Sequence, residues 1–396
     1  MSERFINPVV RDVPPSGIRR FFDIAGTMQG AISLGVGEPD FVTPYHIRDA
    51  AIRSLEDGQT QYTANRGILS LRKEIAIYLE NRFSLSYDPE KEILVTVGGS
   101  EGIDLALRVC VTPGCEVLIP DPGYVSYCPC VTLAGGVPVP VRTYAKDDFR
   151  VTAESLEQAI TPKTKALIFP YPNNPTGAVM EEEYLAAIAE VCNKHDLLVI
   201  TDEIYAELTY SGRHVSIASL PGMRERTVYL NGFSKAFAMT GWRMGYACGP
   251  KCIIDMMNKI HQYTIMCAPR QGQVAAEEAL KRGREDGYKD ILTMRRSYDQ
   301  RRHLMLNTFR EMGLECFEPR GAFYCFPRVS HLGKTSEEFC TELLQNYKVV
   351  CVPGGAFGAS GEGHIRCCYA TDIRLMEKAF ERMKQYIDSV SGGNHA

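Results

Sequence analysis

The sequence predicts an α/β protein with a mostly parallel central sheet flanked by helices, together with a smaller α+β unit. Two observations predict this fold class. Between about residues 44 and 250, amphipathic helical stretches alternate with short apolar runs, which is typical of βαβ units. Runs such as KALIF and LLVIT are apolar on both sides, as expected of strands that helices cover on both faces. The 396 residues also suffice for two domains at about 150 residues each.

Apolar runs and helical periodicity place the elements of the larger unit. Strands are expected at residues 93–97, 116–119, 137–141, 165–169, 197–201, 227–231 and 244–248. Helices are expected at residues 44–57, 67–82, 100–109, 123–134, 152–160 and 181–195. Strand and helix therefore alternate along most of this span, as a parallel sheet requires.

The remaining sequence predicts a connector and a second unit. Residues 270–310 are helical in pattern without strong turn signals, so a long connecting helix is expected there. Beyond it, a short strand in GAFYCFP, a helix near 335–345, two further strands and a C-terminal helix over 372–388 predict a small α+β unit within 314–396.

The N-terminal 40 residues are rich in proline and show no long helix, so we expect them to pack against the small unit. The prolines are Pro8, Pro14, Pro15 and Pro39. The predicted organisation is an N-terminal arm over 1–43, a large domain over 44–295 and a small domain over 296–396.

Composition and charge argue against several classes of function. Lys and Arg number 44 against 48 Asp and Glu, so the net charge of −4 offers no basic field for nucleic acid. No run approaches 18 consecutive apolar residues, and the first twelve residues lack the apolar core of a secretory signal. We therefore expect neither export nor membrane spanning, and a cytoplasmic location. The 14 cysteines form no Cys-x-x-Cys pair, which favours reduced thiols over a metal site.

Ligands of open α/β sheets bind beyond the carboxyl ends of the strands, so polar residues that follow predicted strands are candidate site residues. The strand at 93–97 runs into GGSEG, where Gly99, Ser100 and Glu101 open a helix. Free N–H groups at a helix start favour an anion such as phosphate. The segment lacks the Lys-Ser/Thr of a nucleotide P-loop, and a plain helix cap at Ser100 is an equal alternative.

Two further strand ends carry candidates. After 165–169 comes YPNNPTG with Asn174, a segment that in isolation is more often only a turn. After 197–201 come Asp202 and Tyr205. A carboxylate at this sheet edge is costly to desolvate without a cation or a protonated ring nitrogen, although Asp202 could instead cap the following turn.

The strand at 227–231 leads to Ser234, Lys235 and Arg243 in NGFSKAFAMTGWRMG. A lysine among small and apolar residues favours a lowered pKa and imine formation with an aldehyde, and Arg243 with Ser234 suits a phosphate. The alternative is a surface lysine and an arginine in a salt bridge. Together the four strand ends suit a phosphorylated heteroaromatic aldehyde, and pyridoxal 5'-phosphate matches all of them.

The sequence resembles the class I/II aminotransferases, which are pyridoxal-phosphate enzymes of fold type I. The blocks SLGVGEPDF, YTANRG, GGSEG, PNNPTG, TDEIYAEL, SKAFAMTGWRMG, GAFY and HIRCCYA occur in the family's order over nearly the whole chain. The resemblance is strongest to a bacterial and archaeal branch with aspartate, aromatic and N-acetyl-diaminopimelate aminotransferases.

The resemblance implies roles at the ring of the cofactor. Lys235 would form the Schiff base with the cofactor and later carry the proton at the substrate α-carbon. Asp202 would pair with the pyridinium nitrogen. Asn174 and Tyr205 would hydrogen-bond the phenolate oxygen, Tyr124 would stack on the ring, and the Asn174–Pro175 bond would be cis. For Tyr124 a core position is the alternative.

The resemblance also implies roles at the two anionic ends of the site. The backbone of Gly99 and Ser100, with Ser234 and Arg243, would hold the phosphate, and Glu101 belongs to the same cofactor-binding turn. Tyr62 would reach the phosphate from a neighbouring subunit, which implies a homodimer with shared sites. Arg366, helped by the backbone of Gly37, would bind the substrate α-carboxylate, with an ordinary strand-edge ion pair as the alternative.

The chain departs from aspartate-specific relatives. Where these use a second arginine for the side-chain carboxylate, Tyr263 falls near the position, and Arg270 is a possible substitute. A pocket lined by Ile18, Tyr124 and Tyr324 would accept aromatic or aliphatic side chains.

The implied activity is a ping-pong transfer of the amino group of an L-amino acid to a 2-oxo acid, with 2-oxoglutarate as the expected acceptor. A cysteine-S-conjugate β-lyase of the same fold is the alternative. A cofactor-binding transcription regulator is disfavoured, because only about 40 proline-rich residues precede the large domain.

Overall fold

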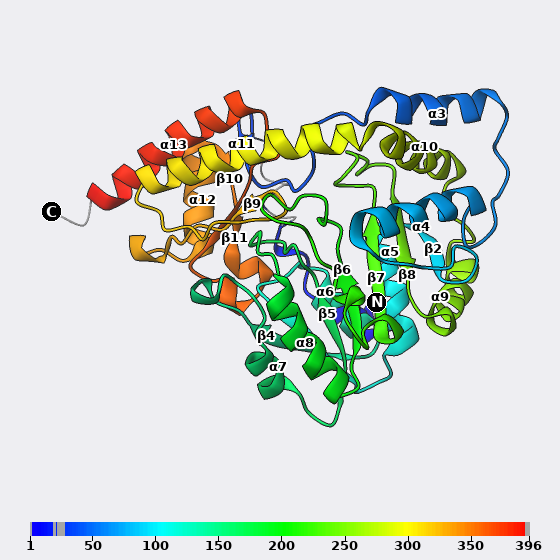
Figure 1. Cartoon of the computed structure of the whole chain (residues 1–396). Coiled ribbons are helices and arrows are strands. Elements are labelled where there is room, and N and C mark those ends of the chain that lie inside the picture. Colours follow the sequence, from blue (N-terminus) through cyan, green and yellow to red (C-terminus); the bar gives the residue numbers. More distant parts are fainter. Residues whose placement is uncertain (1, 19–20, 22–27, 393–396) are drawn as a thin grey trace.

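The computed structural model describes residues 2–18, 21 and 28–392, and its larger part is built on one seven-stranded sheet (Figure 1). The strand order is β2-β8-β7-β6-β5-β3-β4, and β8 runs antiparallel to both of its neighbours while the other pairs are parallel. The strands are β2 (Ile93–Val97), β3 (Glu116–Asp121), β4 (Val137–Arg142), β5 (Thr164–Phe169), β6 (Leu198–Asp202), β7 (Thr227–Gly232) and β8 (Met244–Cys248). All seven predicted strands are present, so the predicted α/β class with a mostly parallel sheet is confirmed.

Alternate residues of these strands pack on opposite faces of the sheet, and helices cover both faces. Leu94, Val117 and Ile200 belong to the core beneath one set of helices. These are α5 (Gly98–Cys110), α6 (Tyr127–Leu133) and α9 (Lys251–Thr264). On the other face, Val95 and Leu118 pack against the remaining helices. These are α7 (Ala153–Ala159) and α8 (Glu182–Lys194) at one end, and α4 (Leu69–Phe83) and α10 (Arg270–Asp286) at the other.

The six predicted helices of this unit are present, and α3 (Tyr45–Glu56) packs on α10 at the surface. The helix predicted over 123–134 begins only at Tyr127, because the backbone N–H of Gly123 instead donates to the carbonyl of Phe357 in the loop that precedes the helix. Helix α9 was not predicted. Its buried residues Ile254, Met257 and His261 follow helical spacing, so the periodicity was present in the sequence.

The predicted long connector is two helices rather than one. Helix α10 ends at Asp286, and α11 (Lys289–Glu311) starts three residues later. Gly287 adopts a left-handed φ of 72°, which is typical of a helix C-terminus and breaks the hydrogen-bond ladder. The expectation of a single helix over 270–310 was therefore wrong at this glycine. Figure 1 shows α11 leading from α10 to the smaller unit, where it lies beside α13.

The smaller unit contains two short sheets and three long helices. Strands β11 (Val352–Pro353), β12 (Ile365–Cys368) and β9 (Tyr324–Cys325) form one sheet, and β1 (Ile32–Ser33) pairs in parallel with β10 (Val349–Val350) in the other. Helices α11, α12 (Ser336–Tyr347) and α13 (Ile373–Gly392) cover them. The β1–β10 pairing fastens the segment before the larger unit to this smaller sheet. Further short helices are α1 (Pro8–Asp12), η1 (Glu3–Phe5), η2 (Ala145–Asp147), η3 (Ile217–Ser219), η4 (Arg224–Arg226), η5 (Ser330–Leu332), η6 (Gly354–Phe357) and η7 (Ala359–Gly361).

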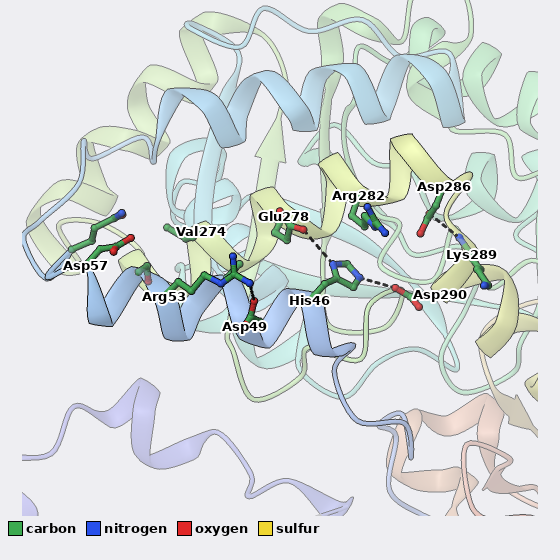
Figure 2. Close-up of a pocket in the computed structure, with 13 residues that line it drawn as sticks. His46, Asp49, Arg53, Asp57, Val274, Glu278, Arg282, Asp286, Lys289 and Asp290 are labelled. Carbon is green, nitrogen blue, oxygen red and sulfur yellow. Dashed lines mark hydrogen bonds and ion pairs between the residues drawn. The ribbon is translucent and has the colours of Figure 1, made fainter.

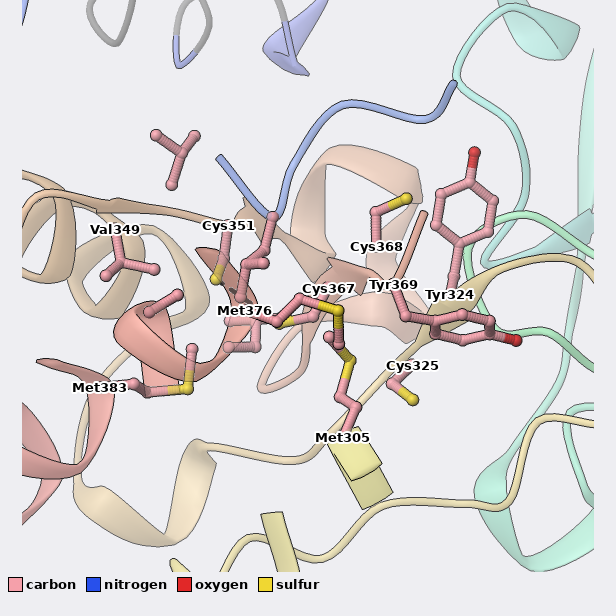
Figure 3. Close-up of a cluster of buried hydrophobic side chains, with 14 of the residues drawn as sticks. Met305, Tyr324, Cys325, Val349, Cys351, Cys367, Cys368, Tyr369, Met376 and Met383 are labelled. Carbon is pink, nitrogen blue, oxygen red and sulfur yellow. Dashed lines mark hydrogen bonds between the residues drawn. The ribbon is translucent and has the colours of Figure 1, made fainter. Parts of the chain in front are cut away.

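The core of the smaller unit is rich in sulfur (Figure 3). Cys325 lies opposite Cys367 in the β9–β12 ladder, and the Cys367 thiol is 3.5 Å from the Cys351 sulfur. All three side chains are fully buried, and burial raises the pKa of the Cys325 and Cys367 thiols well above its ordinary value. The 14 cysteines of the chain are all free. We call Cys325, Cys367 and Cys351 the thiol row.

Among the described residues, no helix is both long and apolar enough to cross a membrane.

Candidate active site

A cavity of about 690 Å³ opens at the carboxyl ends of the parallel strands, where the sequence places most of the candidate residues. Asp202 is the last residue of β6, and Lys235 follows the end of β7 by three residues. The cavity walls include thirteen of the predicted site residues, namely Ile18, Gly37, Gly99, Ser100, Tyr124, Asn174, Asp202, Tyr205, Ser234, Lys235, Arg243, Tyr324 and Arg366. The fold therefore brings together side chains from both units and from the N-terminal arm.

Lys235 occupies the middle of this set of residues. Its Nζ donates to the carbonyl oxygen of Gly37 at 2.6 Å, and it lies 5.9 Å and 5.5 Å from the ring centroids of Tyr205 and Phe323. Burial lowers the pKa of the Lys235 amine to about 8. At pH 7 about a tenth of this amine is thus unprotonated, far more than of an ordinary lysine, and the unprotonated form is the one that attacks an aldehyde.

Asp202 forms the acidic end of the cavity. One carboxylate oxygen accepts from the hydroxyl of Tyr127 at 2.9 Å, and the other accepts from the backbone N–H of Ile204 at 3.3 Å. Burial raises the pKa of the Asp202 carboxyl, and the hydrogen bond from Tyr127 acts in the opposite direction. A buried carboxylate held in this way is suited to a protonated ring nitrogen. Tyr127 was not predicted, although it lies only three residues after Tyr124.

Arg366 of β12 points its guanidinium group toward the same cavity from the smaller unit. Nη1 donates to Oδ1 of Asn174 at 2.8 Å and Nη2 to the carbonyl of Gly35 at 2.6 Å, while Nε is buried without a partner among the described residues. The aromatic ring of Tyr324 lies 4.5 Å from the guanidinium carbon. Because Arg366 occupies Oδ1 of Asn174, the amide N–H groups of Asn174 are its donors for a ligand.

The turn between β2 and α5 forms a cradle beside Arg243. A Cβ on Gly98 would lie 2.5 Å from Nη2 of Arg243, and a Cβ on Gly245 would lie 2.5 Å from the Gly98 carbonyl carbon. Only glycine permits this close approach of strand, turn and guanidinium. The first N–H groups of a helix lack partners within the helix, so Gly99 and Ser100 offer donors next to a cation. This end of the cavity suits a phosphate group.

The wall between these two ends is largely aromatic. The hydroxyl groups of Tyr205 and Tyr324 are hydrogen-bonded at 2.8 Å, and Tyr124 stands edge-on to Tyr127. Ile18 from the arm also lines the cavity. The predicted cis bond between Asn174 and Pro175 is present.

Four residues singled out from the sequence lie outside the cavity lining. The Glu101 carboxylate accepts from the backbone N–H of Val97 at 2.5 Å and from Nδ1 of His261 at 2.6 Å, so it faces away from the cavity. We therefore remove Glu101 from the direct cofactor contacts. Tyr62 and Tyr263 are exposed over 79% and 83% of their surface, and Arg270 starts α10 with its Nε buried. Among the described residues, the cavity lining does not include these three side chains.

Sequence reasoning also missed several cavity residues, most of them apolar or small. They are Ser16, Val36, Glu38, Ile103, Val125, Ser126, Pro170, Pro172, Ile204 and Thr240. Glu38 is the one whose position could have been inferred, since it directly follows Gly37 in the quoted block SLGVGEPDF.

A second cavity, of about 580 Å³, lies between α3, α10 and the start of α11 (Figure 2). His46 stands between Glu278 and Asp290, with Nε2 at 2.9 Å from the Asp290 carboxylate and Nδ1 at 3.6 Å from that of Glu278. Arg53 pairs with Asp49 on the same helix. The lining holds five carboxylates against three Lys or Arg side chains and His46, so this cavity does not suit an anionic ligand such as a phosphate.

The donor set of the first cavity fits pyridoxal phosphate. It combines a glycine cradle with Arg243 for a phosphate, an amine of lowered pKa for an aldehyde, and a buried carboxylate for a ring nitrogen. The unpartnered Nε of Arg366 is left for a further anion such as a carboxylate.

Comparisons with known proteins agree with this arrangement. The model of the family described as aminotransferase class I and II matches residues 29–383. The protein YugH of Bacillus subtilis is 54% identical, with 97% of this chain and 98% of that protein covered, and aromatic-amino-acid aminotransferase 2 of Thermococcus litoralis is 45% identical, with 95% and 96% covered. The structure of the aspartate aminotransferase from Thermus thermophilus with maleate superposes with a TM-score of 0.92 at 38% identity, covering 96% of this chain and 99% of that one.

Proposed function

The chain belongs to the class I and II aminotransferase family, and from this premise we propose that it uses pyridoxal 5'-phosphate to move the amino group of an L-amino acid to a 2-oxo acid. The observation that carries the proposal is the amine of Lys235, with its pKa lowered to about 8, in a cavity that has a carboxylate at one end and a phosphate cradle at the other. The proposed acceptor is 2-oxoglutarate, in a ping-pong exchange.

The residues that would hold the cofactor divide by its chemical groups. Gly99, Ser100, Ser234 and Arg243 would bind the phosphate, and Lys235 would hold the aldehyde carbon covalently. When bound, the cofactor supplies a protonated ring that withdraws electrons from the substrate α-carbon.

The ring would be set by three further side chains. Asp202 would keep a proton on the ring nitrogen, and its hydrogen bond from Tyr127 fixes the orientation of the carboxylate. Asn174 and Tyr205 would donate to the phenolate oxygen.

Two side chains act on the substrate. Arg366 would bind the α-carboxylate with its guanidinium fork, so that the α-carbon lies toward Lys235. The Lys235 Nζ, once freed from the cofactor, would take the proton from the substrate α-carbon and deliver it to the carbon of the former cofactor aldehyde, as a base with a pKa near the working pH does efficiently.

We propose that the side-chain pocket favours aromatic and aliphatic substrates over aspartate. Among the described residues that line the cavity, the basic side chains are Lys235, Arg243 and Arg366, which are assigned to the aldehyde, the phosphate and the α-carboxylate. The pocket wall offers Ile18, Tyr124 and Tyr324 to the side chain instead. Comparing phenylalanine with aspartate as amino donor tests this, and equal or faster turnover of aspartate would contradict it.

The exposed Tyr62 supports a homodimer with shared sites. Tyr62 is exposed over 79% of its surface, so its ring makes few contacts within one chain. A neighbouring subunit would bury this ring beside the phosphate end of the site. By this proposal each site takes Lys235 from one subunit and Tyr62 from the other.

Replacing Lys235 tests the proposed function directly. The purified protein is loaded with pyridoxal phosphate and mixed with single L-amino acids, and the loss of the visible absorbance of the bound cofactor is followed. Lys235→Ala is expected to lose both the native absorbance and turnover, while Lys251→Ala, which alters an exposed lysine paired with Asp255, keeps both. Wild-type turnover by Lys235→Ala would refute the role of Lys235. Release of pyruvate and ammonia from cystathionine without an oxo acid would indicate the β-lyase instead.

A further inference from the structure

Behind the phosphate cradle lies a buried pair, Glu101 and His261, that the function proposed above does not use. Glu101 belongs to the first turn of α5, and His261 comes from α9, which packs against α5 (Figure 1). The side chain of His261 is fully buried and that of Glu101 is exposed over only 11% of its surface. Burying a carboxylate beside an imidazole costs free energy unless both groups are hydrogen-bonded, so their hydrogen-bond partners show what the pair stabilises.

The carboxylate of Glu101 holds the start of the cradle. One oxygen accepts from the backbone N–H of Val97 at 2.5 Å, and Val97 is the residue immediately before the turn Gly98–Ser100. As in the acidic half of a capping box, a side chain near the helix start reaches back to the backbone N–H of the N-cap residue, although Glu101 lies one position further along than the third helical residue of that box. The N-cap residue Val97 has no side-chain hydrogen bond of its own to the start of α5.

The other oxygen of Glu101 accepts from Nδ1 of His261 at 2.6 Å. A carboxylate only accepts, so Nδ1 must carry the hydrogen, and this fixes the ring tautomer. Nε2 has no hydrogen-bond partner within the part of the chain that the structure describes. The histidine thus makes one strong side-chain hydrogen bond, and that bond is to Glu101.

We infer that Glu101 and His261 are positioning residues for the phosphate of the cofactor, acting through the backbone of Val97 and the turn that follows it. Gly99 and Ser100 of that turn line the cavity, whereas Glu101 and His261 do not. The clearance around the turn is small, since a Cβ on Gly245 would lie 2.7 Å from the Gly99 nitrogen. Strand β8 thus leaves the turn little room to change the direction of its N–H donors. The Glu101–His261 pair fixes the same turn from the side away from the cavity, through the Val97 N–H.

The inference rests on the proposed cofactor, and the comparison of pyridoxal phosphate with pyridoxal tests it. The two ligands share aldehyde and ring but only one carries the phosphate. Cofactor-free protein is titrated with each, following visible absorbance. For Glu101→Ala we expect affinity for pyridoxal phosphate to fall at least about tenfold while affinity for pyridoxal is unchanged, because the variant leaves the Val97 N–H unpaired and the turn loose.

Matched variants separate positioning from general damage. Asp104→Ala removes a carboxylate three residues further along α5, one that pairs with Arg108 at the surface, and is expected to leave both affinities unchanged. His261→Asn keeps a donor near the position of Nδ1 and should stay close to wild type, whereas His261→Leu should resemble Glu101→Ala. Glu101→Gln keeps one acceptor and should lie between.

A second readout uses inorganic phosphate, whose binding to the cofactor-free protein is measured by calorimetry. Glu101→Ala should bind inorganic phosphate more weakly than Asp104→Ala does. Equal losses of pyridoxal phosphate and pyridoxal affinity, or an unchanged ratio, would overturn the positioning role alone. Wild-type protein that binds neither pyridoxal phosphate nor inorganic phosphate would instead overturn the proposed function together with this inference.

Discussion

At the scale of single residues, the lowered pKa of Lys235 has a measurable consequence. The cause is burial of the amine, which disfavours its charged form, and the neighbouring Arg366 and Arg243 act in the same direction. Below about pH 8 the amine is mainly protonated and unreactive, and above that pH it is mainly neutral.

We therefore expect the rate at which cofactor-free protein combines with pyridoxal phosphate to rise with pH up to about 8 and then to level off. Stopped-flow absorbance between about pH 6 and about pH 10 measures this rate. A rate that still rises steeply toward the ordinary lysine range near pH 10.4 would show that the amine is not perturbed by its surroundings.

Arg366 provides a second prediction, because its role depends on a planar fork rather than on charge alone. Arg366→Lys keeps the charge but loses bidentate geometry, so we expect KM for the amino acid substrate to rise about 10- to 100-fold. Steady-state kinetics with phenylalanine measure this. Arg328→Lys, at a half-exposed ion pair with Glu315, should leave KM unchanged, and a similar rise in both variants would contradict the assignment.

Residue types and strand ends were enough to predict which side chains meet at the cavity, since Asp202 ends β6, Lys235 follows β7 and Arg243 precedes the antiparallel β8 at the same edge of the sheet. The partners were not predictable. Tyr127 and Gly35 are defined by distances of 2.9 Å and 2.6 Å across the fold, and nothing in their local sequence carries that information. Glu101 was placed in the right turn but with the wrong direction, because sequence does not show which way a side chain on a helix start points.

At the scale of elements, the close contact between β8 and the turn before α5 determines the shape of the phosphate end. Gly245 of β8 faces the backbone of Gly98 and Gly99, where a Cβ would lie within 2.5 Å and 2.7 Å of main-chain atoms. Backbone cannot yield as the end of a flexible side chain can, so the strand would have to move.

Gly245→Ala is accordingly expected to lower stability by about 1–3 kcal/mol and to weaken binding of pyridoxal phosphate. Gly241→Ala, in the loop just before β8 and with no atom within 4 Å of the added Cβ, is the matched control and should change neither. Thermal unfolding and absorbance titration measure the two effects, and similar behaviour of both variants would contradict a close contact.

Elements with strong periodicity were predicted within a few residues, as for β2 and β8, whose predicted bounds agree with the structure. Prediction failed where a single backbone conformation decides the outcome. Gly287 ends α10 through a positive φ, and the segment before Tyr127 is a loop instead of helix because the Gly123 N–H donates to the Phe357 carbonyl of the smaller unit. Tertiary contacts of this kind are not expressed in local composition.

At the scale of the whole molecule, the site is assembled from three parts of the chain. The sheet edge supplies Lys235 and Asp202, the smaller unit supplies Arg366, and the N-terminal segment supplies Ile18 and Gly37. The pairing of β1 with β10 fixes this segment to the smaller unit, so a movement of that unit would carry Gly37 and Arg366 together. The proposed dimer would add Tyr62 from outside the chain.

Mixing two impaired variants tests the shared site. Lys235→Ala and Tyr62→Ala are each expected to be weakly active or inactive as separate preparations. In a hybrid dimer, one site takes intact Lys235 from one subunit and intact Tyr62 from the other. After subunit exchange at equal concentrations, about a quarter of wild-type activity should appear, since half of the dimers are hybrids and each has one intact site. No gain over the separate preparations would contradict sharing of Tyr62.

The thiol row allows the opening of the smaller unit's core to be measured by the rate of thiol labelling. Cys325, Cys351 and Cys367 are fully buried, whereas Cys128 and Cys252 are exposed. A thiol-labelling reagent would therefore modify the two exposed cysteines much faster than the three buried ones. The fast phase reports only the surface. Cys192 and Cys248 of the larger unit are buried as well, so the labelled peptides are identified by mass spectrometry. The labelling rate of Cys367 then measures how often the core around β12 opens, and with it how long the strand that carries Arg366 stays in place.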